Sequence, residues 1–201
     1  MFLNRLSFEQ KVMFLRIGHH IANVDGNFEA SEDEMLKHYA LEMNLKHELE
    51  NLLKAVDDES ETIDNMSFEG LVDKISKPSV ARIIAGGVVP GLLVSTIWAA
   101  HGKNEDDKAG NSETHLRNIK DPDFVLEEAL ECFDTRTAQR ILVLELMAVV
   151  YANDSYHPQQ REVIEFILDV FDLSEHLVTV YAEWAKTMLS MQKQGTALIH
   201  L

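Results

Sequence analysis

Four acidic residues stand at positions in the sequence where carboxylates could hold a divalent cation. Asp25 and Asp154 each follow an apolar stretch, and Glu34 and Glu162 each come one short loop later. An aspartate at the end of one helix and a glutamate in the first turn of the next can approach each other across the corner. Oxygen ligands of this kind suit hard cations, so the sequence predicts calcium or magnesium as the candidate cofactor.

The same residues also fit a purely structural role. Asp25 precedes Gly26, a pair that is typical of turns. Glu34 follows Ser31 with the spacing of a capping box, in which each side chain satisfies a backbone N–H of the other residue. The acidic residues do not have the spacing of an EF-hand loop. Metal binding and capping alone therefore stay open as two interpretations.

The histidines and the single cysteine give little support for other chemistry. Glu34 and His38 lie one helical turn apart, which is more typical of a surface pair than of a metal site. Cys132 is the only cysteine, so a cysteine-rich zinc site and an intramolecular disulfide are excluded. No serine or cysteine has a convincing base partner along the sequence. We therefore expect a binding protein rather than an enzyme. The alternative is a membrane-associated protein whose residues 83–100 dock on lipid or on an integral membrane partner, and a hydrolase that uses the acidic residues with a metal is the third hypothesis.

The elements that position these residues occur twice in the chain. The apolar positions of residues 11–56 coincide with those of residues 140–184, which indicates duplication of one helical unit. In this alignment Asp25 falls on Asp154 and Glu34 on Glu162. Each copy is predicted to hold an apolar first helix, at about 8–23 and 138–152, then an amphipathic second helix and a third helix.

No strand-like alternation of useful length occurs, so the sequence predicts an all-α helical bundle. We expect one domain over residues 1–201, built from two three-helix repeats related by a pseudo-twofold axis. The first repeat covers 1–56, an insertion covers 57–123, and the second repeat covers 124–201.

Two finer expectations concern the first helices of the copies. Ser7 and Gln10 have the spacing of a capping box and mark a helix start. Arg16 and Glu145 occupy equivalent, largely apolar positions, so we expect these charges to pair where the two helices cross.

Residues 83–100 carry no charge and as a helix would be about 27 Å long, close to the thickness of a bilayer's hydrocarbon core. A single crossing would separate two copies that must pack on each other. Pro90 and the neighbouring glycines predict instead a helix interrupted near Gly86–Gly91. The segment either fills a core or contacts a membrane or partner through four apolar residues at helical spacing, Leu92, Leu93, Ile97 and Trp98.

The formal net charge of -16 limits the partners of this protein. Such a surface repels nucleic acid and anionic lipid headgroups. It attracts cations, basic peptides and basic protein faces, or it serves only to keep the protein soluble. The opening residues 1–5 lack the apolar core and cleavage site of a secretory signal, so we expect a cytoplasmic location.

The two copies resemble the TerB-like family of tellurite-resistance proteins, which includes a segment of membrane-anchored DnaJ-like co-chaperones. The family pattern is an apolar helix, then Ala-Asp-Gly or a variant, then a serine-started acidic helix. This chain carries Asn23-Val24-Asp25-Gly26 in one copy and Ala152-Asn153-Asp154-Ser155 in the other. The resemblance covers about half of the chain, in two blocks.

This resemblance implies a compact helical domain without enzymatic activity, linked to metal-stress or phage-defence responses. It implies divalent-ion binding through acidic residues and assembly with a protein partner, including a membrane-bound one. Homo-oligomer formation and peripheral membrane contact through residues 83–100 stay open as alternatives.

Overall fold

The computed structural model describes residues 2–26, 29–45, 47, 70, 124–153 and 156–200. Within these ranges the regular elements are all helical, which confirms the predicted all-α class. They are a 3-10 helix η1 (Leu3–Arg5) and the α-helices α1 (Phe8–Asn23), α2 (Ala30–Glu42), α6 (Leu126–Leu130), α7 (Arg136–Val150), α8 (Pro158–Val170) and α9 (His176–Ile199).

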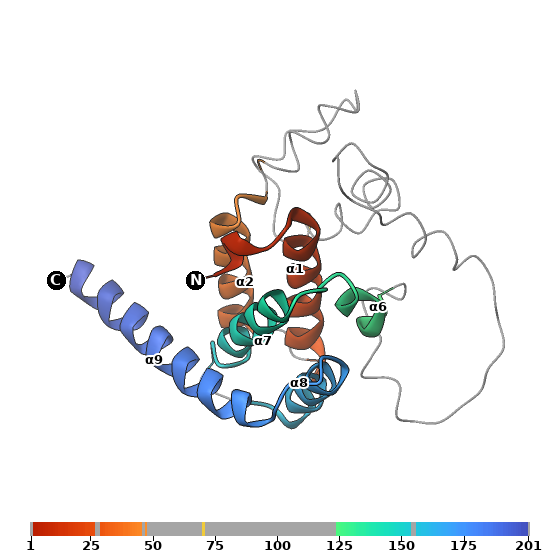
Figure 1. The fold of residues 1–201 in the computed structure, drawn as a ribbon. Coiled ribbons are helices and arrows are strands. Elements are labelled where there is room, and N and C mark those ends of the chain that lie inside the picture. Colours follow the sequence, from red (N-terminus) through yellow and green to blue (C-terminus); the bar gives the residue numbers. More distant parts are fainter. Residues whose placement is uncertain are drawn as a thin grey trace.

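Helix α7 lies at the centre of the bundle and contacts α1, α2, α8 and α9 (Figure 1). It is apolar on nearly every face, and Leu142, Leu146 and Val150 are fully buried. One continuous core joins side chains from α1, α2, α6, α7, α8 and the first part of α9. Helix α7 starts two residues earlier than predicted because Thr135 caps it, its hydroxyl accepting a hydrogen bond from the Ala138 N–H.

The predicted capping box of Ser7 and Gln10 is confirmed at the start of α1. The predicted box of Ser31 and Glu34 was wrong. Helix α2 begins at Ala30, so its N-cap is Glu29, and the Glu29 N–H donates to the Glu32 carboxylate at 3.2 Å. Glu34 lies on the exposed face of this helix.

Helices α2 and α8 begin in the same way. The backbone N–H of the N-cap residue donates to the side chain three residues later, Glu29 to Glu32 in α2 and His157 to Gln160 in α8, each at 3.2 Å. Both helices are 13 residues long. Pro158 follows the α8 N-cap directly, where its missing N–H costs no helical hydrogen bond.

The two helices also end in the same way. Asn44 (φ 54°) and Asp172 (φ 49°) adopt the left-handed conformation that commonly terminates a helix. In each case a basic side chain donates to the carbonyl of the preceding residue, which compensates the unsatisfied helix end. The pairs are Lys11 with Met43 and Arg136 with Phe171.

The charges of Arg16 and Glu145 are both buried, but the expected pairing was wrong. The Glu145 carboxylate accepts hydrogen bonds from the Tyr39 hydroxyl at 3.0 Å and from the Phe2 N–H at 2.6 Å. The guanidinium of Arg16 lies 5.2 Å from the centre of the Phe124 ring instead. Tyr39 and the segment before η1 therefore supply to Glu145 the hydrogen bonds that were expected from Arg16.

The predicted third helix of the first copy falls largely outside the described residues. In the second copy α9 takes this place and continues to Ile199, well beyond residue 184, so its last part projects from the bundle (Figure 1). Residues 83–100, with Leu92, Leu93, Ile97 and Trp98, also lie outside the described residues. Among the helices that are described, none combines the length and apolar character needed to span a bilayer.

Candidate functional site

The starts of α2 and α8 meet at a buried hydrogen bond. The Gln160 side-chain amide donates to one oxygen of Glu32 at 2.7 Å. The other oxygen of Glu32 accepts the N–H of Glu29, and the Gln160 carbonyl oxygen accepts the N–H of His157. Glu32 is 1% exposed and Gln160 is 2% exposed. Each side chain therefore caps the start of its own helix and connects it to the start of the other helix.

Burial is the largest cause that raises the pKa of Glu32 from 4.5 to about 7. The hydrogen bonds from Glu29 and Gln160 lower this pKa, and the negative charges of Asp25 and Glu29 raise it. A carboxyl group with such a pKa exchanges its proton near neutral pH. A cation bound beside Asp25 and Glu32 would favour the ionised form of Glu32.

The four residues predicted to bind a metal lie in different surroundings. Asp25 is half-buried in the turn after α1, which Gly26 completes with φ +79°. Glu34 on α2 and Glu162 on α8 are exposed, and Asp154 lies outside the described residues. Within the part of the chain that is described, no three histidine, cysteine, aspartate or glutamate side chains come close enough to hold a metal ion. The structure therefore does not gather Asp25, Glu34 and Glu162 into one cluster.

Sequence reasoning missed Glu32 and Gln160, although a signal for both was present. Glu32 precedes Met35, Leu36 and Tyr39 by three, four and seven positions, which places it on the buried stripe of α2. Gln160 has the same relation to the buried stripe of α8, whose members are Val163, Ile164 and Ile167.

The most obvious nucleophile among the described residues is poorly suited to attack. Burial, followed by the charge of Glu9, raises the pKa of the Cys132 thiol far above its usual range. Because the thiolate is the reactive form, this environment suppresses nucleophilic chemistry.

The buried carboxyl of Glu145 has a structural role. Burial raises its pKa, while its hydrogen bonds from Phe2 and Tyr39 act in the opposite direction. These hydrogen bonds tie the segment before η1 and helix α2 to α7.

Comparisons with known proteins give no match: no protein-family model, no curated protein and no solved structure is similar to the chain. The TerB-like resemblance of the sequence therefore stays a prediction.

Proposed function

We propose that this protein is a non-enzymatic, TerB-like binding or adaptor protein that responds to divalent cations and acts in a metal-stress or phage-defence response. The proposal begins with its architecture, two copies of one helical unit related by a pseudo-twofold axis. Matching starts, lengths and ends of α2 and α8 support the duplication. The side chains at the helix starts, Glu32 and Gln160, fall on equivalent positions when the two helices are aligned.

The single observation that carries the proposed cation response is the buried hydrogen bond between Glu32 and Gln160. It couples the two copies through a carboxyl group that gains or loses a proton near neutral pH. Calcium or magnesium bound beside Asp25, whose negative charge already acts on Glu32, would stabilise ionised Glu32. Cation binding would thereby release a proton and change the charge at the contact between the copies.

The projecting part of α9 supports the binding of a protein partner. Met191, Leu198 and Ile199 are 66%, 69% and 83% exposed, and Figure 1 shows this part of the helix extending away from the bundle. Exposed apolar side chains that gather on one element are typical of interaction surfaces. A partner with apolar side chains and a basic rim would complement both α9 and the strongly acidic protein.

Isothermal titration calorimetry with calcium and with magnesium tests the cation response. We expect binding that releases protons near pH 7, which is detected as a heat that depends on the ionisation enthalpy of the buffer. Asp25→Asn should abolish the binding.

Glu34→Gln and Glu32→Gln separate the two possible sets of ligands. If Glu32 is the relevant carboxylate, Glu34→Gln binds normally and Glu32→Gln loses the proton release. Loss of binding in Glu34→Gln alone would restore the ligand set predicted from the sequence, and the absence of any binding by the folded wild-type protein would contradict the cation response.

A further inference from the structure

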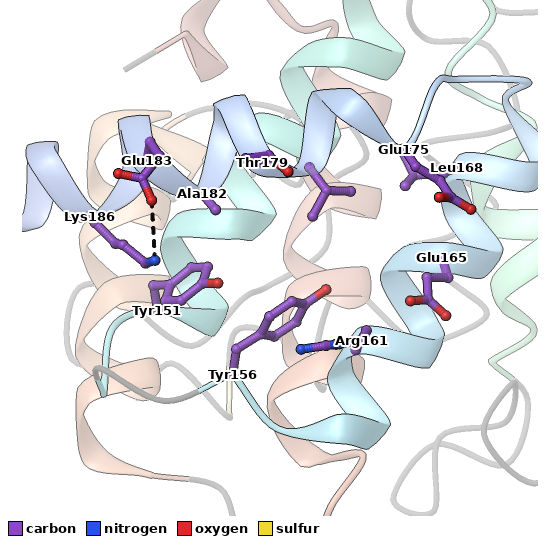
Figure 2. A pocket seen from close by; sticks show the side chains of 11 residues that line it. Tyr151, Tyr156, Arg161, Glu165, Leu168, Glu175, Thr179, Ala182, Glu183 and Lys186 are labelled. Atoms are coloured by element: carbon purple, nitrogen blue, oxygen red, sulfur yellow. Dashed lines mark hydrogen bonds and ion pairs between the residues drawn. The ribbon is translucent and has the colours of Figure 1, made fainter.

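A cavity of about 330 Å³ lies between α8 and α9, and neither Glu32 nor Gln160 lines it. Its size is at the low end of the range for small-molecule sites. The apolar part of its wall comes from Leu168, Val178 and Ala182, and Figure 2 shows the polar side chains around it.

The charged side chains of the cavity are spread along its length. Figure 2 shows Glu165 and Glu175 toward one end and Lys186 toward the other, with Arg161 between them. Lys186 is paired with Glu183 at 3.4 Å, so these two charges largely offset each other. Among the described residues, no ion pair engages Arg161, Glu165 or Glu175. The cavity therefore offers one available cation and two available carboxylates.

Two tyrosines hold the basic part of the cavity in place. The rings of Tyr151 and Tyr156 lie 5.4 Å apart. Lys186 lies 4.9 Å from the centre of the Tyr151 ring, and the Arg161 guanidinium lies 5.3 Å from that of Tyr156. Stacking on a ring orients a guanidinium without using its N–H donors, so those of Arg161 stay available to a ligand.

The Tyr156 hydroxyl is buried and has no hydrogen-bond partner among the residues that the structure describes. It projects from the α8 side of the cavity toward α9 (Figure 2). Burial, the largest cause, and the neighbouring Tyr151 raise its pKa, so the hydroxyl is protonated at neutral pH and is a hydrogen-bond donor. A buried hydroxyl without a partner is costly, so a ligand that brought an acceptor to this hydroxyl would gain a favourable hydrogen bond.

We propose that this cavity binds a free apolar amino acid as its zwitterion. The carboxylate of the ligand accepts hydrogen bonds from the Arg161 guanidinium and the Tyr156 hydroxyl, and the planar fork of arginine suits this group. The ammonium group faces Glu165 and Glu175. The aliphatic or aromatic body of the ligand packs on Leu168, Val178 and Ala182. A second negative charge on the ligand is disfavoured because it would face the same glutamates.

Ligand-observed NMR and calorimetry with L-leucine, L-methionine and L-phenylalanine at millimolar concentration test this proposal. We expect at least one of them to bind the wild-type protein. N-acetyl-L-leucine, which lacks the ammonium group, and L-leucinamide, which lacks the carboxylate, should bind more than about tenfold more weakly than L-leucine, because each leaves charged groups of the cavity unmatched. Absence of binding by all three amino acids, or binding of either derivative as tight as that of L-leucine, would overturn the proposal.

Tyr156→Phe gives a readout that a merely structural role would not produce. Removing a hydroxyl without a partner should leave the melting temperature unchanged or raise it, while affinity for the amino acid falls by about tenfold or more. Arg161→Gln should lower the affinity similarly, and Arg5→Gln, an exposed arginine on η1, is the matched control. A Tyr156→Phe variant that is destabilised but binds with full affinity would contradict the assignment. Cation binding at Asp25 should persist in these variants, so failure here is distinguishable from failure of the proposed cation response.

Discussion

The pKa of Glu32 leads to a quantitative prediction about the pH dependence of stability. The unfolded chain binds this proton with a pKa of 4.5 and the folded protein with a pKa of about 7. Because the folded state holds the proton more tightly, the associated stability is fully present below pH 4.5 and is lost as the pH rises through about 7. At about 1.4 kcal/mol for each tenfold change in proton affinity, Glu32 accounts for a loss of up to about 3 kcal/mol across this window.

Glu32→Gln isolates this contribution because glutamine has nearly the same shape and does not titrate. The free energy of unfolding is measured by urea denaturation, followed by circular dichroism, between about pH 5 and about pH 8. We expect the wild type to lose more stability than Glu32→Gln over this range, by about 2–3 kcal/mol. The variant can be less stable at every pH because its amide opposes the Gln160 amide, so the slope is the relevant quantity.

Glu34→Gln is the matched control, since Glu34 lies two positions further along α2 and is exposed. It should keep the wild-type slope. Parallel curves for the wild type and Glu32→Gln would refute the reasoning, because Glu32 would then have the same proton affinity in the folded and unfolded states.

Three further substitutions test the packing around the proposed sites. Tyr39→Phe removes one hydrogen bond from the buried Glu145 carboxylate and should cost about 1–3 kcal/mol in unfolding free energy, with the larger loss at high pH; an unchanged urea midpoint would contradict this. Gly18→Ala places a methyl group 2.6 Å from the buried side chain of Leu36. Thermal melting should therefore show a net loss of about 1–2 kcal/mol in unfolding free energy, despite the better helix propensity of alanine. A stabilised variant would show that α1 and α2 have room to separate. Gly26→Ala forces a side chain into φ +79° and should cost about 1 kcal/mol by the same measurement, whereas no loss would mean that the turn relaxes.

The helical class and the first helix could be predicted from the sequence because their signals are local. The apolar pattern and the Ser7–Gln10 spacing give α1 its observed bounds, Phe8–Asn23. The start of α2 was misplaced because serine is a far better N-cap type than glutamate, so Ser31 was preferred over Glu29. That shift of two residues selected Glu34 in place of Glu32. Glu32 lies on the buried stripe of α2, but its contact with Gln160 depends on how α2 and α8 meet, which sequence spacing does not give.

The cavity between α8 and α9 could not be predicted in this way. Tyr151 and Tyr156 belong to the turn between α7 and α8, and Lys186, which lies over the Tyr151 ring, comes from a third helix, α9. Sequence spacing gives the face of a helix on which Arg161 or Lys186 lies, but it does not give the distance between two helices. The same limitation explains the wrong partner assigned to Arg16, because the contact with Phe124 depends on a distant segment.

The metal content of the protein tests the proposed cation response most directly. Inductively coupled plasma mass spectrometry after gentle purification without chelators should find about one calcium or magnesium ion per chain in the wild type, as expected for a site with oxygen ligands. The Asp25→Asn variant, purified in the same way, should contain almost none. A folded wild-type protein that is free of metal and does not take up either ion on dialysis would contradict the account.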